Sequence, residues 1–201
     1  MKTSSSQKIS VKYILRALGA SVLLAAILVF VMMAVMKGQS EPSYGGDFTL
    51  SFRDQVWNFS NHTKKLNVLY IGYAKCPDVC PMSLSVAAQA FQKLSEKELK
   101  KVQLIFVSVD HENDTDIEVA NYAQQFFAEF VGLSGSEEQI KKTVSQFYSS
   151  YLLEKDPNSY LGYSISHTDR LYFLNSKGMV MSTIPNPRDA GEVFKMIRTK
   201  L

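Results

Sequence analysis

The two cysteines of the chain, Cys76 and Cys80, stand four residues apart between an apolar run and a segment of helical periodicity. Pro81 follows the second cysteine. Because proline suits the first helical position and keeps the residue before it out of the α region, we expect Cys80 to be a helix N-cap. Unpaired amides and the helix dipole stabilise an anion there, which lowers a thiol pKa. The spacing therefore predicts a reactive and accessible thiolate pair.

Two other interpretations of this pair are a stapling disulfide and two buried thiols. A disulfide that closes so short a loop would remove little chain entropy, which favours the reactive interpretation. The same sulfurs could still form a redox-active disulfide when no metal is bound. Two soft thiolates with an imidazole favour Cu(I) and also allow Cu(II). A structural zinc site takes four ligands, and the chain has no third cysteine to complete one.

Nearly continuous apolar runs at residues 66–73 and 102–109 predict strands that are covered on both faces, as in a parallel sheet. The helical spacing of residues 81–99 between them predicts a βαβ unit. The cysteines then lie in its first loop, at the carboxyl end of a strand. This edge of an open α/β sheet is where ligands usually bind.

The remaining segments complete the predicted order of elements. They are a hairpin of residues 48–52 and 56–59, helices at 115–130 and 136–151 with a short strand at 130–133 between them, a hairpin of 170–174 and 179–182, and a helix at 192–200. This order predicts an α/β, thioredoxin-like fold with an N-terminal β-hairpin and a helical insertion.

The N-terminal part of the chain predicts a membrane anchor. Residues 17–36 carry no charge, and about 20 apolar residues are needed to span a bilayer as a helix. A cleaved signal peptide would have a shorter apolar region and an Ala-x-Ala site, so we favour an uncleaved transmembrane helix. Basic residues precede the span, which places residues 1–16 in the cytoplasm and the domain on the opposite side.

Residues 37–46 then form a linker, and residues 47–201 form the folded domain. A disulfide-permissive side of the membrane suits the cysteine pair, so we expect a single-pass protein of the bacterial inner membrane, with its domain in the periplasm or on the outer face. An organellar inner membrane is the alternative, but the N-terminus lacks an Arg-rich amphipathic pattern. The net charge of +3 is too small and dispersed to indicate nucleic acid binding.

Several short segments, in order, resemble the Sco/SenC family of copper proteins associated with cytochrome c oxidase assembly. They are residues 45–50, Gly-Gly-Asp-Phe-Thr-Leu; residues 76–81, with the Cys-x-x-x-Cys motif; residues 107–110 with 114–115; residues 132–135; and residues 166–168, Ser-His-Thr. The resemblance implies a copper ion bound by Cys76, Cys80 and His167. His167 also begins the strand of the late hairpin, which in a thioredoxin-like fold lies beside the first strand and starts near the cysteine loop.

The family resemblance implies a membrane-anchored copper chaperone, not an enzyme with turnover, that delivers one copper ion to the CuA site of cytochrome c oxidase. Its expected partners are the oxidase subunit that carries this site, other copper chaperones and thiol reductants. The alternative is a thiol:disulfide oxidoreductase that reduces a partner's metal-site cysteines or acts in redox signalling, using the same cysteine pair.

Other residues near the predicted site have weaker support as ligands. His111 also leaves a predicted strand at the carboxyl edge, but the family usually has proline there. His62 lies in a predicted surface loop. Asp78 either orients a ligand or only favours the helix start. The family commonly has an acidic residue in the segment just before the histidine, whereas Ser166 precedes His167 here. The sequence therefore does not identify a residue that would hydrogen-bond and orient the imidazole.

Overall fold

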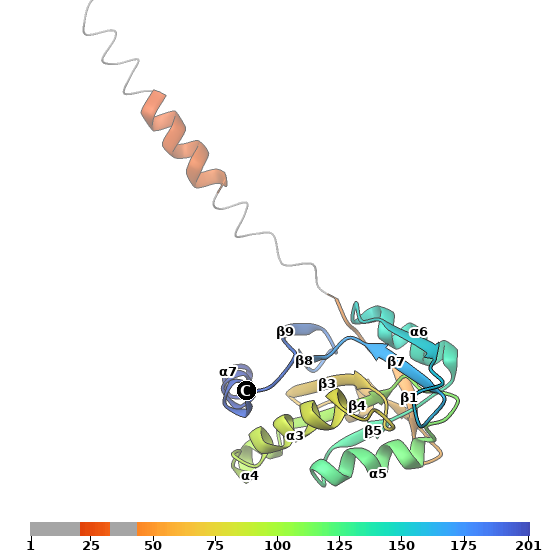
Figure 1. Ribbon diagram of the computed structural model, residues 1–201. Coiled ribbons are helices and arrows are strands. Elements are labelled where there is room, and N and C mark those ends of the chain that lie inside the picture. The colour runs from red at the N-terminus through yellow and green to blue at the C-terminus, as the bar shows by residue number, and fades with distance from the viewer. Residues whose placement is uncertain (1–20, 33–43) are drawn as a thin grey trace, which may run out of the picture. The chain divides into compact units, whose positions relative to one another are not determined.

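The computed structural model describes residues 21–32 and 44–201 (Figure 1). The chain divides into two units, residues 1–42 and 43–201. Residues 21–32 are helical with exposed side chains. Within the described ranges, no helix has both the length and the hydropathy that crossing a membrane requires. The transmembrane segment predicted at residues 17–36 lies partly outside the described residues. The predicted cytoplasmic segment, residues 1–16, lies entirely outside them, and so does most of the predicted linker.

A five-stranded sheet forms the centre of the second unit, in the order β5-β4-β3-β8-β9. The strands are β3 (Leu66–Gly72), β4 (Val102–Ser108), β5 (Val131–Leu133), β8 (Arg170–Leu174) and β9 (Val180–Pro185). β3, β4 and β5 are parallel, whereas β8 and β9 are antiparallel to their neighbours. Every residue of β3 and β4 is buried, so these strands are covered on both faces, as predicted.

The helix between β3 and β4 differs from the single predicted helix at 81–99. α3 spans Val79–Phe91 and α4 spans Glu96–Leu99. The break has a local cause: the Ser95 hydroxyl accepts a hydrogen bond from the Glu98 amide, and the Ser95 amide donates one to the Glu98 carboxylate. This capping box starts a new helix. The predicted N-cap was also wrong: Asp78 is the N-cap, and Pro81 is the third helical residue. The first turn tolerates proline because its amides have no partner within the helix.

The next two helices begin where the sequence predicts and end earlier. α5 (Asp116–Phe126) and α6 (Glu137–Gln146) each start with a capping box, formed by Thr115 with Glu118 and by Ser136 with Gln139. α7 (Ala190–Lys200) closes the chain, and α3 packs against both α7 and α5. In Figure 1, α3 and α5 lie on one side of the sheet and α6 lies toward the other.

Two hairpins flank the sheet. β1 (Thr49–Phe52) and β2 (Gln55–Asn58) form the predicted N-terminal hairpin, which the short helix α2 (Phe59–His62) follows. The second hairpin, β6 (Tyr151–Lys155) with β7 (Tyr163–His167), was not predicted. Most side chains of β6 are exposed, so its sequence lacks the apolar alternation of a half-buried strand. His167 therefore ends a strand, whereas the sequence placed it at the start of one.

The end of the predicted linker packs on the domain. The amide of Gly45 donates to the Gln146 carbonyl (2.9 Å), and the amide of Gly46 donates to the Gly178 carbonyl (3.0 Å). The ring of Tyr44 stacks on that of Tyr148, with 4.9 Å between centroids. These contacts attach residues 44–46 to the C-terminal half of the domain.

Candidate metal centre

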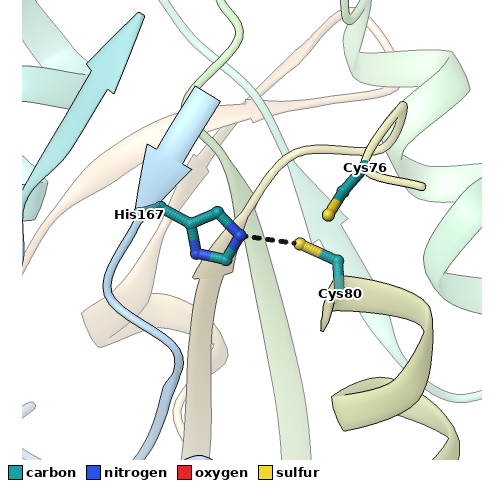
Figure 2. A group of neighbouring side chains, drawn as sticks. All are labelled: Cys76, Cys80 and His167. Carbon is teal, nitrogen blue, oxygen red and sulfur yellow. Dashed lines mark hydrogen bonds between the residues drawn. The ribbon is translucent and has the colours of Figure 1, made fainter. Parts of the chain in front are cut away.

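The two cysteine sulfurs lie at the end of β3, where the chain turns into α3 (Figure 2). Cys76 lies in the connecting loop and is 9% exposed, and Cys80 lies in the first turn of α3 and is fully buried. The accessible thiolates expected from the sequence are thus largely covered. Gly72 makes this burial sterically feasible, because a Cβ on it would lie 2.5 Å from Cys80 Sγ.

The buried carboxylate of Asp114 holds the beginning of the cysteine loop. It accepts hydrogen bonds from the Ala74 amide (2.6 Å) and from the Ser108 hydroxyl (2.7 Å), and it pairs with Lys75 Nζ (3.1 Å). Its side chain has no exposed surface. The hydroxyl of Tyr160, from the connection between β6 and β7, donates to the Lys75 carbonyl (3.0 Å). Side chains from two other parts of the chain therefore fix the entry of the loop.

His167 enters the site from the end of β7 and points toward α3 (Figure 2). Its Nε2 lies 3.1 Å from Cys80 Sγ, and its Nδ1 lies 3.3 Å from the Thr168 carbonyl oxygen. Nε2 therefore faces the sulfur and is the ring nitrogen positioned to bind a metal ion. The rings of Tyr70 and Tyr73 contact the imidazole edge-on, with centroids 6.3 and 6.0 Å away.

The ligand atoms of Cys76, Cys80 and His167 all lie within 4.8 Å of one another. Two ligands on opposite sides of one ion, each with a bond of about 2.3 Å, would be about 4.6 Å apart. Small side-chain movements would therefore suffice to close these three groups on one ion. Two sulfurs and one imidazole nitrogen form a donor set that suits Cu(I) and also accommodates Cu(II).

The two thiols have opposite pKa shifts. A hydrogen bond from the Cys80 thiol, with further ones from the His167 side chain and from the Asp78 and Cys80 amides, lowers the pKa of Cys76 to about 4 against the cost of burial. Burial, and then the neighbouring Cys76 anion, raise the pKa of Cys80. The lowered pKa expected for both cysteines therefore holds only for Cys76. In the metal-free pair the thiolate form is thus favoured at Cys76 and disfavoured at Cys80.

The other candidates from the sequence lie outside this cluster. His111 lines a groove of about 420 Å³ on the surface of α6 and β6. His62 stacks on Trp57, with 5.0 Å between ring centroids, and its Nδ1 lies 2.9 Å from the Asn58 carbonyl oxygen. Asp78 is exposed, and its side chain makes no capping hydrogen bond.

Sequence reasoning missed three residues that support the site. Gly72 makes room for the Cys80 sulfur, Asp114 holds the loop, and Asp169 accepts hydrogen bonds from residues beside the ligands. A glycine that ends an otherwise apolar run was an available signal for a close approach. Nothing in the local sequence marks Asp169, because its partners are distant along the chain.

This fold and this cluster define the class of the protein: a thioredoxin-like domain with a centre of two cysteines and one histidine. Residues 36–201 match the SCO1/SenC family. An SCO2-like protein of Rickettsia conorii is 27% identical over 161 residues, which cover 78% of this chain and 76% of the relative. The chain therefore belongs to the SCO1/SenC family.

Solved structures of relatives share this fold. Apo Sco1 from Thermus thermophilus is 28% identical with a TM-score of 0.72, and the match covers 81% of this chain and 94% of that one. Arabidopsis thaliana ScoI, whose structure has copper bound, is 27% identical with a TM-score of 0.71, and the match covers 78% of this chain and 97% of that one. The matches to both structures extend over most of the chain.

Proposed function

We propose that this protein is a copper chaperone that binds one copper ion through Cys76, Cys80 and His167 and delivers it to the CuA site of cytochrome c oxidase during assembly. The observation that carries the proposal is the convergence of the three ligand atoms within 4.8 Å. The copper-bound structure of Arabidopsis ScoI supports copper as the cargo. The family resemblance supports cytochrome c oxidase as the recipient.

The protonation states of the two cysteines suggest the order of copper capture. Cys76 is already a thiolate at neutral pH and can bind Cu(I) first. Cys80 must then release its proton to become the second ligand, so binding releases about one proton per copper ion. Nε2 of His167 completes the site. Release to a recipient follows the reverse path, with incoming ligands replacing these three.

The anchor completes the proposed placement. Residues 17–36 would hold the chain in the bacterial inner membrane, with residues 1–16 in the cytoplasm and the domain in the periplasm or on the outer face. The uncharged sequence and the helical, exposed apolar side chains of residues 21–32 support this part of the proposal. An anchored donor would stay at the membrane in which the oxidase resides.

A second function, thiol:disulfide exchange, is favoured by the low pKa of Cys76. The Cys76 thiolate would attack a partner disulfide and form a mixed disulfide, and one partner cysteine would leave as a thiolate. Cys80, once deprotonated, would then attack Cys76 Sγ and release the second partner cysteine. The partner gains two electrons, and the Cys76–Cys80 pair becomes a disulfide.

Copper titration of the purified full-length chain under reducing conditions tests the first function. We expect one Cu(I) per parent chain and a loss of affinity of tenfold or more in His167→Ala, because one of three ligands is removed. The matched control is His111→Ala, which removes an imidazole outside the cluster and should leave affinity unchanged. Absence of specific copper binding in the parent would refute the chaperone and leave the exchange function.

A further inference from the structure

A polar network lies beside His167 and Cys80, with the carboxylate of Asp169 at its centre. Asp169 Oδ1 accepts from the hydroxyls of Tyr70 (3.0 Å) and Ser83 (2.8 Å). Asp169 Oδ2 pairs with Arg188 Nη2 (2.8 Å). The Asp169 side chain is only 9% exposed, so these bonds replace most of its hydration. Arg188 Nη1 closes the network by donating to Ser83 Oγ (3.1 Å).

The members of this network adjoin the two buried ligands. Asp169 follows His167 by two residues, in the turn between β7 and β8. Ser83 follows Cys80 by three residues in α3, so the two side chains lie on the same face of the helix. Tyr70 donates to Asp169 and also contacts the His167 ring edge-on. The Asp169 carboxylate thus connects the turn that follows His167 to the helix that carries Cys80.

Cys76 belongs to a different set of contacts. Its loop is held by Asp114 and by Tyr160, and among the described residues the hydrogen bonds of these two side chains do not involve Asp169, Ser83 or Arg188. The site therefore has two separately supported parts: a fixed part with Cys80 and His167, whose ligand atoms are 3.1 Å apart, and a loop with Cys76.

We propose that Asp169, held by Arg188, is a positioning residue that sets the relation of His167 to Cys80. This proposal rests on the proposed function, because the positioned groups are the copper ligands. Asp169→Asn keeps the size of the side chain, but it removes the negative charge and replaces one acceptor oxygen with a donor amide. The amide can no longer satisfy the Tyr70, Ser83 and Arg188 donors together, so the turn and the helix are released from each other.

The test uses one readout without metal and one with copper, both on the full-length chain. The metal-free readout is the rate of iodoacetamide labelling at each cysteine, followed by peptide mass spectrometry. We expect labelling of Cys80 to rise tenfold or more in Asp169→Asn, while labelling of Cys76 stays within about twofold. With copper, we expect affinity to fall about 10- to 100-fold, as is typical when a partner of a metal ligand is removed. The Cu(II) EPR hyperfine splitting should also change.

Three variants separate positioning from general loss of stability. Arg198→Gln removes an ion pair with Glu98 that lies away from the site. Ser136→Ala removes the capping hydrogen bond of α6, which lowers stability without touching the network. Arg188→Lys keeps the positive charge opposite Asp169, but a single ammonium cannot reproduce the two guanidinium contacts, one to Asp169 and one to Ser83. Its effect on Cys80 labelling and copper affinity should therefore lie between those of the parent and Asp169→Asn.

The outcomes are distinct for the two proposals. Cys80 labelling in Asp169→Asn that equals labelling in Ser136→Ala and Arg198→Gln would overturn the positioning role. A parent chain that binds no copper would overturn the chaperone function, while the labelling rates would still decide whether Asp169 positions the two elements. Raised labelling of Cys80 together with weaker copper binding in the same variant would support both.

Discussion

At the scale of single residues, Cys76 and Cys80 have the same side chain and opposite acidity. Cys76 receives a hydrogen bond from the Cys80 thiol and others from His167 and two backbone amides, all of which favour its anion. Cys80 is buried against β3, and burial together with the Cys76 anion outweighs its hydrogen bonds from the Tyr73 amide and the Tyr70 hydroxyl, so its anion is disfavoured. A helix N-terminus therefore does not make every nearby thiol acidic, because burial can outweigh it.

This difference predicts the pH dependence of alkylation of the metal-free, reduced chain. The thiolate is the reactive form, and an ordinary thiol with a pKa of about 8.5 loses reactivity as the pH falls below that value. With its pKa lowered to about 4, Cys76 should react at a nearly constant rate from about pH 8 to pH 5 and lose reactivity only near pH 4. Site-resolved mass spectrometry measures this rate, with the unfolded chain in urea as control. A midpoint near pH 8 for Cys76 in the folded chain would contradict it.

Gly72 gives a second prediction at this scale. In Gly72→Ala the new Cβ would lie 2.5 Å from Cys80 Sγ, so the sulfur or the strand must shift. Overpacking of this kind costs about 1–3 kcal/mol, and we expect copper affinity to fall at least tenfold as the sulfur is displaced. The control is Gly135→Ala, where the new Cβ approaches the flexible Leu50 side chain, away from the cysteines. Urea unfolding and copper competition measure the two effects, and unchanged copper affinity would refute this role of Gly72.

At the scale of elements, the site depends on how the cysteine loop is attached to β4 and α5. Asp114, which lies before α5, accepts hydrogen bonds from the Ala74 amide and the Ser108 hydroxyl at the same carboxylate oxygen. A change of this carboxylate would weaken or remove the acceptor of both donors. The loop itself has few regular backbone hydrogen bonds among the described contacts, the Cys76 amide donating to the Tyr73 carbonyl (3.2 Å). Its conformation is therefore imposed by a neighbouring element.

We expect Asp114→Asn to lower the free energy of unfolding by about 2 kcal/mol, because a buried acceptor is replaced in part by a donor. Urea denaturation followed by tryptophan fluorescence measures this change. The matched control is Glu137→Gln, which breaks the exposed pair with Lys141 (2.5 Å) and should change stability little, because surface pairs are screened by water. Equal effects of the two substitutions would contradict the role assigned to Asp114.

At the scale of the whole molecule, the metal centre lies within one of two compact units, residues 43–201. All the supporting contacts of the site described above lie within this unit. We expect a chain of residues 43–201 to unfold cooperatively with the same urea midpoint as the full-length chain and to keep its copper stoichiometry. Circular dichroism and copper titration of both chains test this. A lower midpoint in the shorter chain would mean that residues before 43 stabilise the domain.

The sequence was sufficient for the thioredoxin-like class, the cysteine pair and the starts of α5 and α6. These features depend on local patterns: apolar runs, the Cys-x-x-x-Cys spacing and capping boxes. The position of His167 was inferred from the family resemblance and from the predicted fold, and the hairpin that carries it was missed because most side chains of β6 are exposed and only Ile165 of β7 is buried.

The contacts that give the site its chemistry depended on the folded chain. Cys80 is separated from His167 by 87 residues and Ser83 from Asp169 by 86, so no local pattern links either pair. The opposite pKa shifts of the cysteines follow from burial on Gly72 and from donors that only the folded loop aligns. Burial and long-range hydrogen bonds are properties of the packed molecule, whereas residue type and periodicity are already present in the unfolded chain.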